Sequence, residues 1–333
     1  MTPAELLAGM GEAPGGGLLV ALSGGADSAV AAWVAMSVRR DGVRALHIHH
    51  GTAAADELAA AAAAVAVALG IPLESVDVEV PPGASWESRA RDARWAALFA
   101  KAEPTDVIVT GHHEDDLAET TLGNLLRGAG ARGLAAIAAP RPDIWRPLVD
   151  FSRADLRSVA IELELPFVDD PANQDTTFAR NRLRHEVLPQ LEEVAPHTIE
   201  GLARTARLLA ADDAALEAVA AAAPIRRDAW GAVAVAAALV TTAAPAVASR
   251  IVRRLLREAN PPYAGSVADV ATVHDVAAGA VAAGEVSGGF RVEREGPLIV
   301  VHRGSIAAPS AQPMAVPGAA MFGRFEVAAA APP

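Results

Sequence analysis

Short apolar runs rich in β-branched residues alternate with longer helical stretches through the first half of the chain. Four of the short runs are expected to form buried strands, at Leu18–Leu22, Val43–His49, Leu73–Val78 and Asp106–Thr110. Three of the longer stretches have the length of crossover helices, at Ser28–Arg40, Ala55–Leu69 and Trp86–Ala100. Strand–helix alternation of this kind predicts an α/β fold on a doubly wound parallel sheet, in which ligands bind beyond the carboxyl ends of the strands.

The pattern becomes helical from Asp150 onwards. Ser152 is expected to cap a helix over Arg153–Leu163. Further helices are predicted from about Arg180 and over His197–Ala222.

The region after Pro224 is rich in Ala, Val and Arg and contains strand-like runs at Phe290–Val292 and Leu298–His302. We therefore place the main boundary near Leu208–Pro224. This gives a catalytic domain over residues 1–207 and a smaller, mainly helical domain over residues 208–333. The tail after Ala307 contains several prolines and is expected to be poorly ordered.

Composition narrows the classes of protein and site. The chain has no cysteine, which excludes disulfides, thiolate zinc sites and persulfide chemistry. Hydrophobic residues make up 52% of the chain, but much of that share is alanine. Because the apolar runs are too short to span a bilayer and no signal peptide is recognisable, we expect a soluble, cytoplasmic protein with no membrane partner.

The formal net charge of −12 argues mildly against a nucleic-acid partner, although a local basic patch is what binds phosphates. Lys101 is the only lysine, and every other fixed cation is arginine. Arginine suits bidentate phosphate contacts, and it equally suits a GC-rich genome.

A glycine-rich segment follows the first predicted strand and opens the first predicted helix. It reads Ser23-Gly24-Gly25-Ala26-Asp27-Ser28. Glycines let the backbone approach a phosphate, and a helix N-terminus offers free N–H groups, so these six residues are expected to bind a nucleotide. Asp27 beside phosphates is repulsive without a divalent cation between them, which makes it a candidate magnesium ligand. No lysine follows, so this is not a Walker A loop, and a capped glycine-rich turn without a ligand is the alternative.

A second polar segment follows the fourth predicted strand. It reads Gly111-His112-His113-Glu114-Asp115-Asp116-Leu117-Ala118-Glu119-Thr120. Asp116 and Glu119 share a helix face, and His112 lies near the end of the strand. Such a group can hold magnesium, orient an amine or accept a proton, so all three are candidate catalytic residues and Asp116 is a second candidate magnesium ligand. An acidic helix start stabilised by the helix dipole explains Asp115 and Asp116 without function, but it does not explain the two histidines.

Together the two segments resemble the tRNA(Ile)-lysidine synthetases of the PP-loop ATP pyrophosphatase superfamily. The resemblance continues through ordered short motifs that begin at His47, Glu87, Leu125, Arg146, Asp170, Arg180 and Leu188. It covers about residues 17–205 and is faint beyond Leu208. Leu117 stands where the family usually has glutamine. The resemblance implies a Rossmann-like PP-loop domain.

The resemblance also implies a reaction. Such an enzyme binds the isoleucine tRNA with a CAU anticodon and uses ATP, Mg²⁺ and free L-lysine. The base oxygen at carbon 2 of the wobble cytidine attacks the ATP α-phosphate and releases pyrophosphate. The ε-amine of lysine then attacks carbon 2 of the adenylated cytidine and expels AMP.

Residue roles follow from the same resemblance. Asp116 and Glu119 are expected to hold the lysine, with a weaker case for His112. Arg91 and Arg184 are expected to bind the lysine carboxylate or the polyphosphate. The arginines of 180–184 are predicted to face tRNA or phosphate, unless they form a solvated helix face, and the same alternatives stay open for the arginines of 250–257. The sequence does not indicate an oligomeric state.

Two other functions compete with this hypothesis. The first is another PP-loop enzyme. Sulfur-inserting tRNA enzymes are disfavoured because the chain has no cysteine, and NAD and GMP synthetases would not explain the His-His-x-Asp-Asp segment. The second is a nucleotide sensor that keeps the phosphate loop without turnover.

Overall fold

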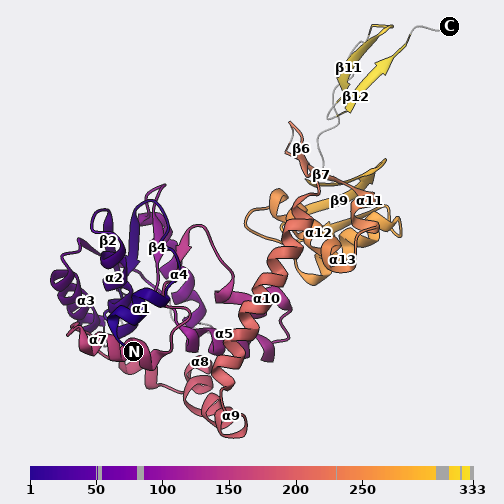
Figure 1. Ribbon diagram of the computed structural model, residues 1–333. Helices are drawn as coiled ribbons and strands as arrows, with labels where there is room; N and C mark the ends of the chain where they lie inside the picture. The colour runs from indigo at the N-terminus through magenta and orange to yellow at the C-terminus, as the bar shows by residue number, and fades with distance from the viewer. Residues whose placement is uncertain are drawn as a thin grey trace. The chain divides into compact units, whose positions relative to one another are not determined.

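The computed structural model describes residues 1–49, 51, 55–80, 86–229, 231–304, 315–322 and 325–330. Among the features discussed above, His50 and the tail prolines Pro309, Pro313 and Pro332 lie outside these residues. The chain forms two compact units, Met1–Asp213 and Ala214–Pro333 (Figure 1). The division falls within Leu208–Pro224, where the hydrophobic pattern changes.

The first unit is built on a five-stranded parallel sheet. Four strands confirm the prediction: β1 (Leu18–Ala21), β2 (Val43–His49), β3 (Leu73–Asp77) and β4 (Val107–Val109). A fifth strand, β5 (Ile144–Trp145), is too short to give a sequence signal. The order β3-β2-β1-β4-β5 confirms a doubly wound sheet, because the chain builds one edge from β1 and then returns to build the other from β4. The crevice for a ligand is therefore expected where β1 and β4 end.

The helices that begin in this unit include the predicted crossovers. Their bounds are α1 (Pro3–Gly9), α2 (Ala26–Val38), α3 (Ala55–Leu69), α4 (Trp86–Lys101), α5 (Glu114–Leu126), α6 (Ala131–Ala135), α7 (Arg153–Glu162), α8 (Ala179–Arg182), α9 (Leu188–Val194) and α10 (Thr198–Ala221). Short 3₁₀ turns, η1 (Ala136–Ala138) and η2 (Pro171–Gln174), and one π-helical turn, η3 (Leu183–Val187), connect some of them. Within the described segments, no helix is both long and apolar enough to cross a membrane.

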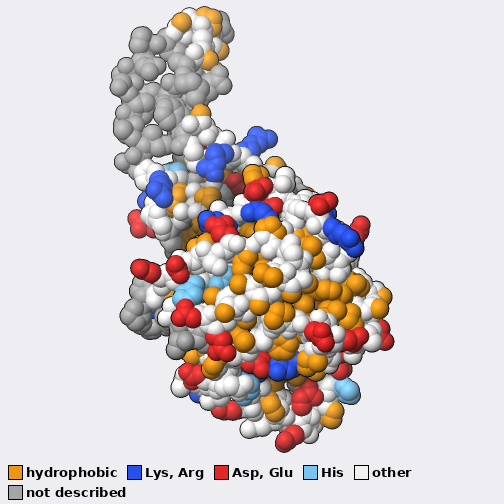
Figure 2. Space-filling view, turned by 90° about the vertical axis from the view of Figure 1, so that its left-hand side faces the viewer, with side chains coloured by type: hydrophobic (Ala, Val, Ile, Leu, Met, Phe, Trp, Pro, Cys, Tyr) orange, Lys and Arg blue, Asp and Glu red, His pale blue; other side chains and the backbone are white. Residues whose placement is uncertain are grey.

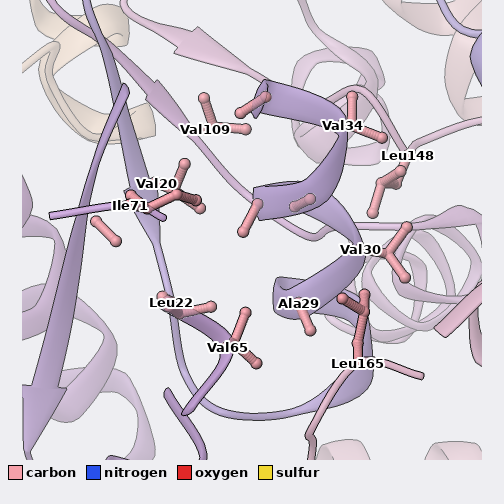
Figure 3. Close-up of a cluster of buried hydrophobic side chains, with 14 of the residues drawn as sticks. Val20, Leu22, Ala29, Val30, Val34, Val65, Ile71, Val109, Leu148 and Leu165 are labelled. Carbon is pink, nitrogen blue, oxygen red and sulfur yellow. The ribbon is translucent and has the colours of Figure 1, made fainter. Parts of the chain in front are cut away.

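Strand β1 packs on both faces, as a central strand of a parallel sheet must. Val20 and the following Leu22 lie in a core with α2, α3 and α7 (Figure 3), whereas Leu19 lies in a core with Leu98 of α4. Small alanines let α2 lie close to the sheet. The outer side of α3 is also alanine and valine, with Val67 82% exposed, and hydrophobic side chains cover much of the face in Figure 2.

The second unit combines helices with an antiparallel sheet. Its strands are β6 (Arg226–Arg227), β7 (Val233–Ala236), β8 (Ala283–Val286), β9 (Phe290–Glu295) and β10 (Leu298–Arg303), in the order β6-β7-β10-β9-β8. Its helices are α11 (Ala237–Thr241), α12 (Pro245–Ala259) and α13 (Val267–Ala278). The sequence predicted β9 and β10 but missed the other three strands, so the expected helices share this unit with a full sheet. A further hairpin pairs β11 (Gly318–Phe322) with β12 (Phe325–Ala329).

Three arginines of α12 have structural partners. Arg253 donates to the carbonyl oxygen of Gly265 at 2.6 Å, and Arg254 donates to that of Ala220 at 2.5 Å. Arg250 lies 3.7 Å from a carboxylate oxygen of Glu217. These contacts explain the positions of Arg250, Arg253 and Arg254 without a nucleic-acid partner.

The buried carboxylate of Asp269, on α13, forms hydrogen bonds with the segment before α13 and with the turn after β8. It accepts hydrogen bonds from the Tyr263 hydroxyl at 2.8 Å, from the Ser266 backbone N–H at 2.8 Å and from the Ser287 backbone N–H at 2.9 Å. Burial opposes ionisation, but these hydrogen bonds outweigh it and hold the pKa of Asp269 well below its usual value of 3.8.

Replacing Asp269 by alanine is expected to destabilise this unit by about 2–3 kcal/mol, because buried donors lose a charged acceptor. Since the folded pKa is depressed, the stabilisation is present above pH 3.8 and is lost as the pH falls toward the folded value. Hydrogen exchange of the α13 amides measures both effects. Asp275→Ala, at an exposed aspartate on the same helix, is the matched control and should change protection little. Equal protection in the two variants would contradict this role for Asp269.

Candidate active site

The phosphate loop lies between β1 and α2, and its geometry requires glycine at position 24. Gly24 has φ +91°, and a Cβ there would lie 2.3 Å from the carbonyl oxygen of Leu58. The Ser28 hydroxyl accepts from the Ser23 backbone N–H at 3.1 Å and donates to the Gly25 carbonyl at 2.9 Å. The Ser28 side chain therefore stabilises the loop through hydrogen bonds to its backbone. The first N–H groups of α2, from Ala26 and Asp27, are the groups available to an anion.

The second polar segment lies directly against this loop. A Cβ at Gly111 would lie 2.7 Å from the backbone of Asp27, so the end of β4 and the start of α2 approach as closely as glycine allows. His112 shares a hydrogen bond of 2.8 Å with the hydroxyl of Thr110. Glycine at 111 thus brings the two predicted motifs together.

His113 links the two motifs. Its Nδ1 accepts the Asp116 backbone N–H at 3.4 Å, as the N-cap of α5. Its Nε2 lies 3.5 Å from a carboxylate oxygen of Asp27 and 3.4 Å from one of Asp116. The sequence predicted a role for His112 and none for His113. The local pattern does not show which of two adjacent histidines has its side chain buried at the start of α5.

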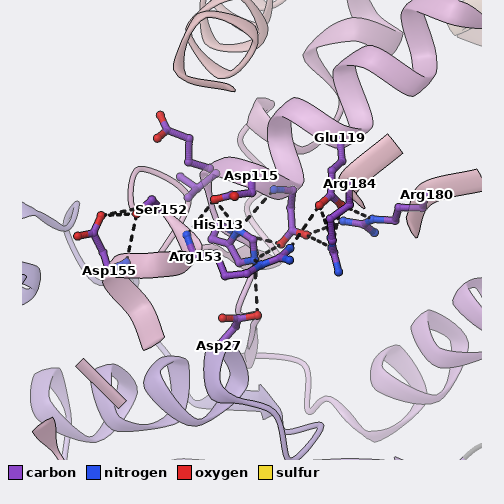
Figure 4. Close-up of polar contacts among 12 residues, drawn as sticks. Asp27, His113, Asp115, Glu119, Ser152, Arg153, Asp155, Arg180 and Arg184 are labelled. Carbon is purple, nitrogen blue, oxygen red and sulfur yellow. Dashed lines mark hydrogen bonds and ion pairs between the residues drawn. The ribbon is translucent and has the colours of Figure 1, made fainter. Parts of the chain in front are cut away.

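Glu119 is the centre of an arginine cluster (Figure 4). It is 2% exposed. Arg184 bonds to its carboxylate at 2.5 and 2.9 Å, Arg180 at 2.7 Å and Arg153 at 3.3 Å. Arg180 also donates to Asp116 at 2.6 Å.

The structure therefore divides the predicted arginine cluster of 180–184. Arg180 and Arg184 point to the buried carboxylates, whereas Arg182 is exposed. Arg153 was expected only as the first residue of a helix. It joins the site from a distant part of the chain, and no local motif indicates that role.

These partners keep the two carboxylates ionised. Burial opposes the ionisation of Asp116, but His113 and Arg180 outweigh it and hold its pKa well below the usual value. For Glu119, burial is likewise outweighed by Arg184 and Arg180, and the pKa is lowered. Both groups are therefore anionic at neutral pH.

The pKa values of the two histidines shift in opposite directions for a physical reason. Burial lowers the pKa of His112 to about 3, with Arg146 and Arg94 adding to the effect against the opposing charge of Asp116. Burial also disfavours the charged form of His113, but Asp116 and Asp27 outweigh it and raise its pKa. His112 is therefore a neutral hydrogen-bonding group at neutral pH.

A second group of arginines lies beside His112. Burial lowers the pKa of Arg94 to about 10, with repulsion from Arg91 and Arg180 adding to it. Burial likewise lowers the pKa of Arg146 to about 10, with repulsion from Arg141 and Arg91. The Nε of Arg146 is buried without a hydrogen-bond partner among the described residues. We call Arg91, Arg94 and Arg146 the basic group.

The basic group was predicted in part. Arg91 was named from the sequence, and Arg94, three residues on along α4, shares its helix face. The three-residue spacing from Arg91 could therefore have predicted that Arg94 belongs to the same group. Arg146 follows β5 and could not be placed until that strand was known.

Of the two predicted magnesium ligands, Asp27 and Asp116, only Asp27 has a carboxylate that suits the ion. Asp27 has a side chain 38% exposed, beside the N-terminus of α2. Mg²⁺ binds through one or two carboxylates together with substrate phosphates and water, and Asp27 fits that role. Both oxygens of Asp116 are engaged, one by Arg180 and the other by His113. No cluster of three or more acidic or histidine side chains that could hold a metal occurs in the described part of the chain.

Comparison with known proteins agrees with this geometry. Residues 4–191 match the family model described as a PP-loop domain. The tRNA(Ile)-lysidine synthase of Pseudomonas aeruginosa is 46% identical over 200 residues, which are 57% of this chain and 45% of that protein. The synthase of Xanthomonas axonopodis pv. citri is 41% identical over 213 residues, 61% of this chain and 48% of that protein. The matched region spans less than half the length of these relatives.

Among solved structures, the U34-tRNA thiolase NcsA of Methanococcus maripaludis aligns with a TM-score of 0.49 at 18% identity, over 62% of this chain and 76% of that one. The resemblance to the tRNA(Ile)-lysidine synthetases that the motifs indicated is confirmed by the named relatives. The family model covers more than half of the chain, including the phosphate loop and the Glu119 cluster, and the chain belongs to the PP-loop family.

Proposed function

We propose that this protein is an ATP-dependent ligase that attaches L-lysine to carbon 2 of the wobble cytidine in tRNA(Ile) with a CAU anticodon. In the first step the base oxygen at carbon 2 bonds to the α-phosphorus of ATP, and pyrophosphate leaves. In the second step the ε-nitrogen of lysine bonds to carbon 2. The oxygen leaves with AMP, and the amine loses a proton.

One observation carries the proposal. The phosphate loop and the buried carboxylate pair, which such a reaction needs for ATP and for the amine, are joined through His113. Its Nε2 lies 3.5 Å from Asp27 and 3.4 Å from Asp116. A nucleotide at the loop and an amine at the carboxylates would therefore be neighbours at the carboxyl edge of the sheet.

The first step builds negative charge on phosphate oxygens. A magnesium ion held by Asp27 would neutralise part of that charge and polarise the triphosphate. The N-terminus of α2 and the basic group supply fixed positive charge on the same side. Burial and repulsion from neighbouring arginines outweigh the attraction of Asp116 for Arg94 and of Asp143 for Arg146, so a bound anion would stabilise both guanidinium groups.

The second step requires an oriented amine. Asp116 and Glu119 stay ionised, because their pKa values are lowered, and an ionised carboxylate binds an ammonium group well. A carboxylate with a lowered pKa is correspondingly a weak base. Their proposed role is therefore to bind and orient the ε-nitrogen.

The acidic total charge does not contradict a tRNA partner. The net charge is a property of the whole molecule, whereas phosphates bind to a local group of basic side chains. Figure 2 shows acidic side chains scattered over one face, without a single acidic patch.

The decisive experiment is mass spectrometry of the wobble nucleoside after incubation with tRNA(Ile), ATP and lysine. A cytidine that gains lysine supports the proposal. Pyrophosphate release that does not need tRNA would favour a small-molecule ligase, and no release under any condition would favour a nucleotide sensor.

Asp27→Asn is expected to slow tRNA-dependent pyrophosphate release by about 10²-fold or more, because a neutral amide cannot hold the cation that screens the triphosphate. Asp41→Asn is the matched control, since Asp41 is exposed beyond the other end of α2. Activity of Asp27→Asn within about threefold of the control would remove Asp27 from the metal site.

Glu119→Gln should impair the lysine step while adenylation continues, since the amide keeps the shape of the carboxyl group but loses its charge. Single-turnover assays should show accumulation of adenylated tRNA or a raised KM for lysine, by about tenfold or more. Pyrophosphate release in the same reaction is the internal control for folding and ATP binding. If pyrophosphate release falls to the same extent, Glu119 belongs to the ATP site instead.

A further inference from the structure

The carboxylates assigned to the amine are occupied by the protein itself. Arg184 and Arg180 bond to Glu119 at 2.5 and 2.7 Å, and Arg180 bonds to Asp116 at 2.6 Å. Guanidinium groups thus stand where a substrate ammonium group would have to bind. A lysine side chain can reach these oxygens only if an arginine gives up its contact.

The arginines are better placed to move than the carboxylates. The Glu119 side chain is 1% exposed and sits in the middle of α5, so it stays where it is. The side chains of Arg180 and Arg184 are 28% and 16% exposed. They come from the short helix α8 and the π-helical turn η3, a rare conformation that is frequent at functional sites.

Electrostatics decides when the arginines can leave. An amine that arrived alone would displace a guanidinium into a site where Arg94 already repels positive charge. An anion that arrived alone would draw an arginine away and leave a buried carboxylate short of a partner, which is costly. When both arrive, an arginine pairs with phosphate and the amine pairs with carboxylate, so no charge is left without a partner.

We propose that Arg180 and Arg184 are gate residues that occupy the amine subsite until the phosphates of a bound nucleotide draw them away, so that nucleotide and lysine bind with positive coupling. This inference rests on the proposed function and adds a binding order to it. By linkage, lysine strengthens nucleotide binding by the same factor.

The test is calorimetric titration of L-lysine into the full chain, without RNA, in the absence and presence of α,β-methylene-ATP with Mg²⁺. Wild type is expected to bind lysine about tenfold or more tightly with the nucleotide, as is typical of coupled sites. L-Norleucine, which lacks the ε-amine, should show no such gain.

Arg184→Gln should bind lysine more tightly than wild type when no nucleotide is present, and its coupling should fall. A gain of affinity on removing an arginine separates a gate from a purely structural role. Arg182→Gln is the matched control, because Arg182 lies two residues away and is exposed. If Arg184→Gln does not fold, Arg184→Lys is the second variant. It keeps the positive charge but loses the bidentate contact with Glu119, so the coupling between nucleotide and lysine should be reduced.

The outcomes separate the gate from the function. Equal lysine affinity with and without nucleotide in wild type overturns the gate, as does full coupling in the folded Arg184 variant. If lysidine forms on tRNA under these results, the proposed function stands and only the gate is lost. If lysine binds under neither condition and no modified nucleoside forms, both fail.

Discussion

A buried carboxylate needs counter-charges, and in this protein Glu119 meets that need with three arginines from other segments. Moving such a group out of water is costly unless it is paired and hydrogen-bonded. Arg153 begins α7, Arg180 lies in α8 and Arg184 lies in η3, so one carboxylate on α5 fixes three further segments. The arrangement of these segments around α5 depends on this pairing. The candidate site is thus built from ion pairs between Glu119 and arginines of three other segments.

The sequence predicted the scaffold of the first unit because its signals are local. β-Branched runs alternate with alanine-rich helices, and the Ser23–Ser28 segment lies at a strand end and a helix start. The partners of Glu119 could not be predicted in the same way. Arg153 lies 34 positions from it and Arg184 lies 65 positions away, so only the fold brings them together. His113 was missed for a related reason, since two adjacent histidines look alike until the direction of the helix start is known.

The second unit was harder to predict because its strands resemble its helices in composition. β7 reads Val-Ala-Val-Ala and runs directly into α11, so an alanine–valine segment gives no sign of where strand becomes helix. β6 has only two residues, and both are exposed arginines. β7 is a strand because it pairs with β10, and the two are far apart in the sequence, so a local pattern does not predict the pairing. Strand β9 was predictable because Phe290 and Val292 alternate with charged residues, and β10 because four apolar residues, Leu298–Val301, follow one another.

The net charge of the chain is a poor guide to the charge of its candidate site. A total of −12 suggests a protein that avoids polyanions, yet the candidate site brings several arginines together. Glu119 and Asp116 form ion pairs with Arg180 and Arg184, and Arg94 and Arg146 are further buried arginines of the same site. A site of this kind favours ligands that bring opposite charges together, because each ion pair broken inside the protein must be replaced by one made to a ligand. A triphosphate and an amine meet that condition jointly, and neither meets it alone.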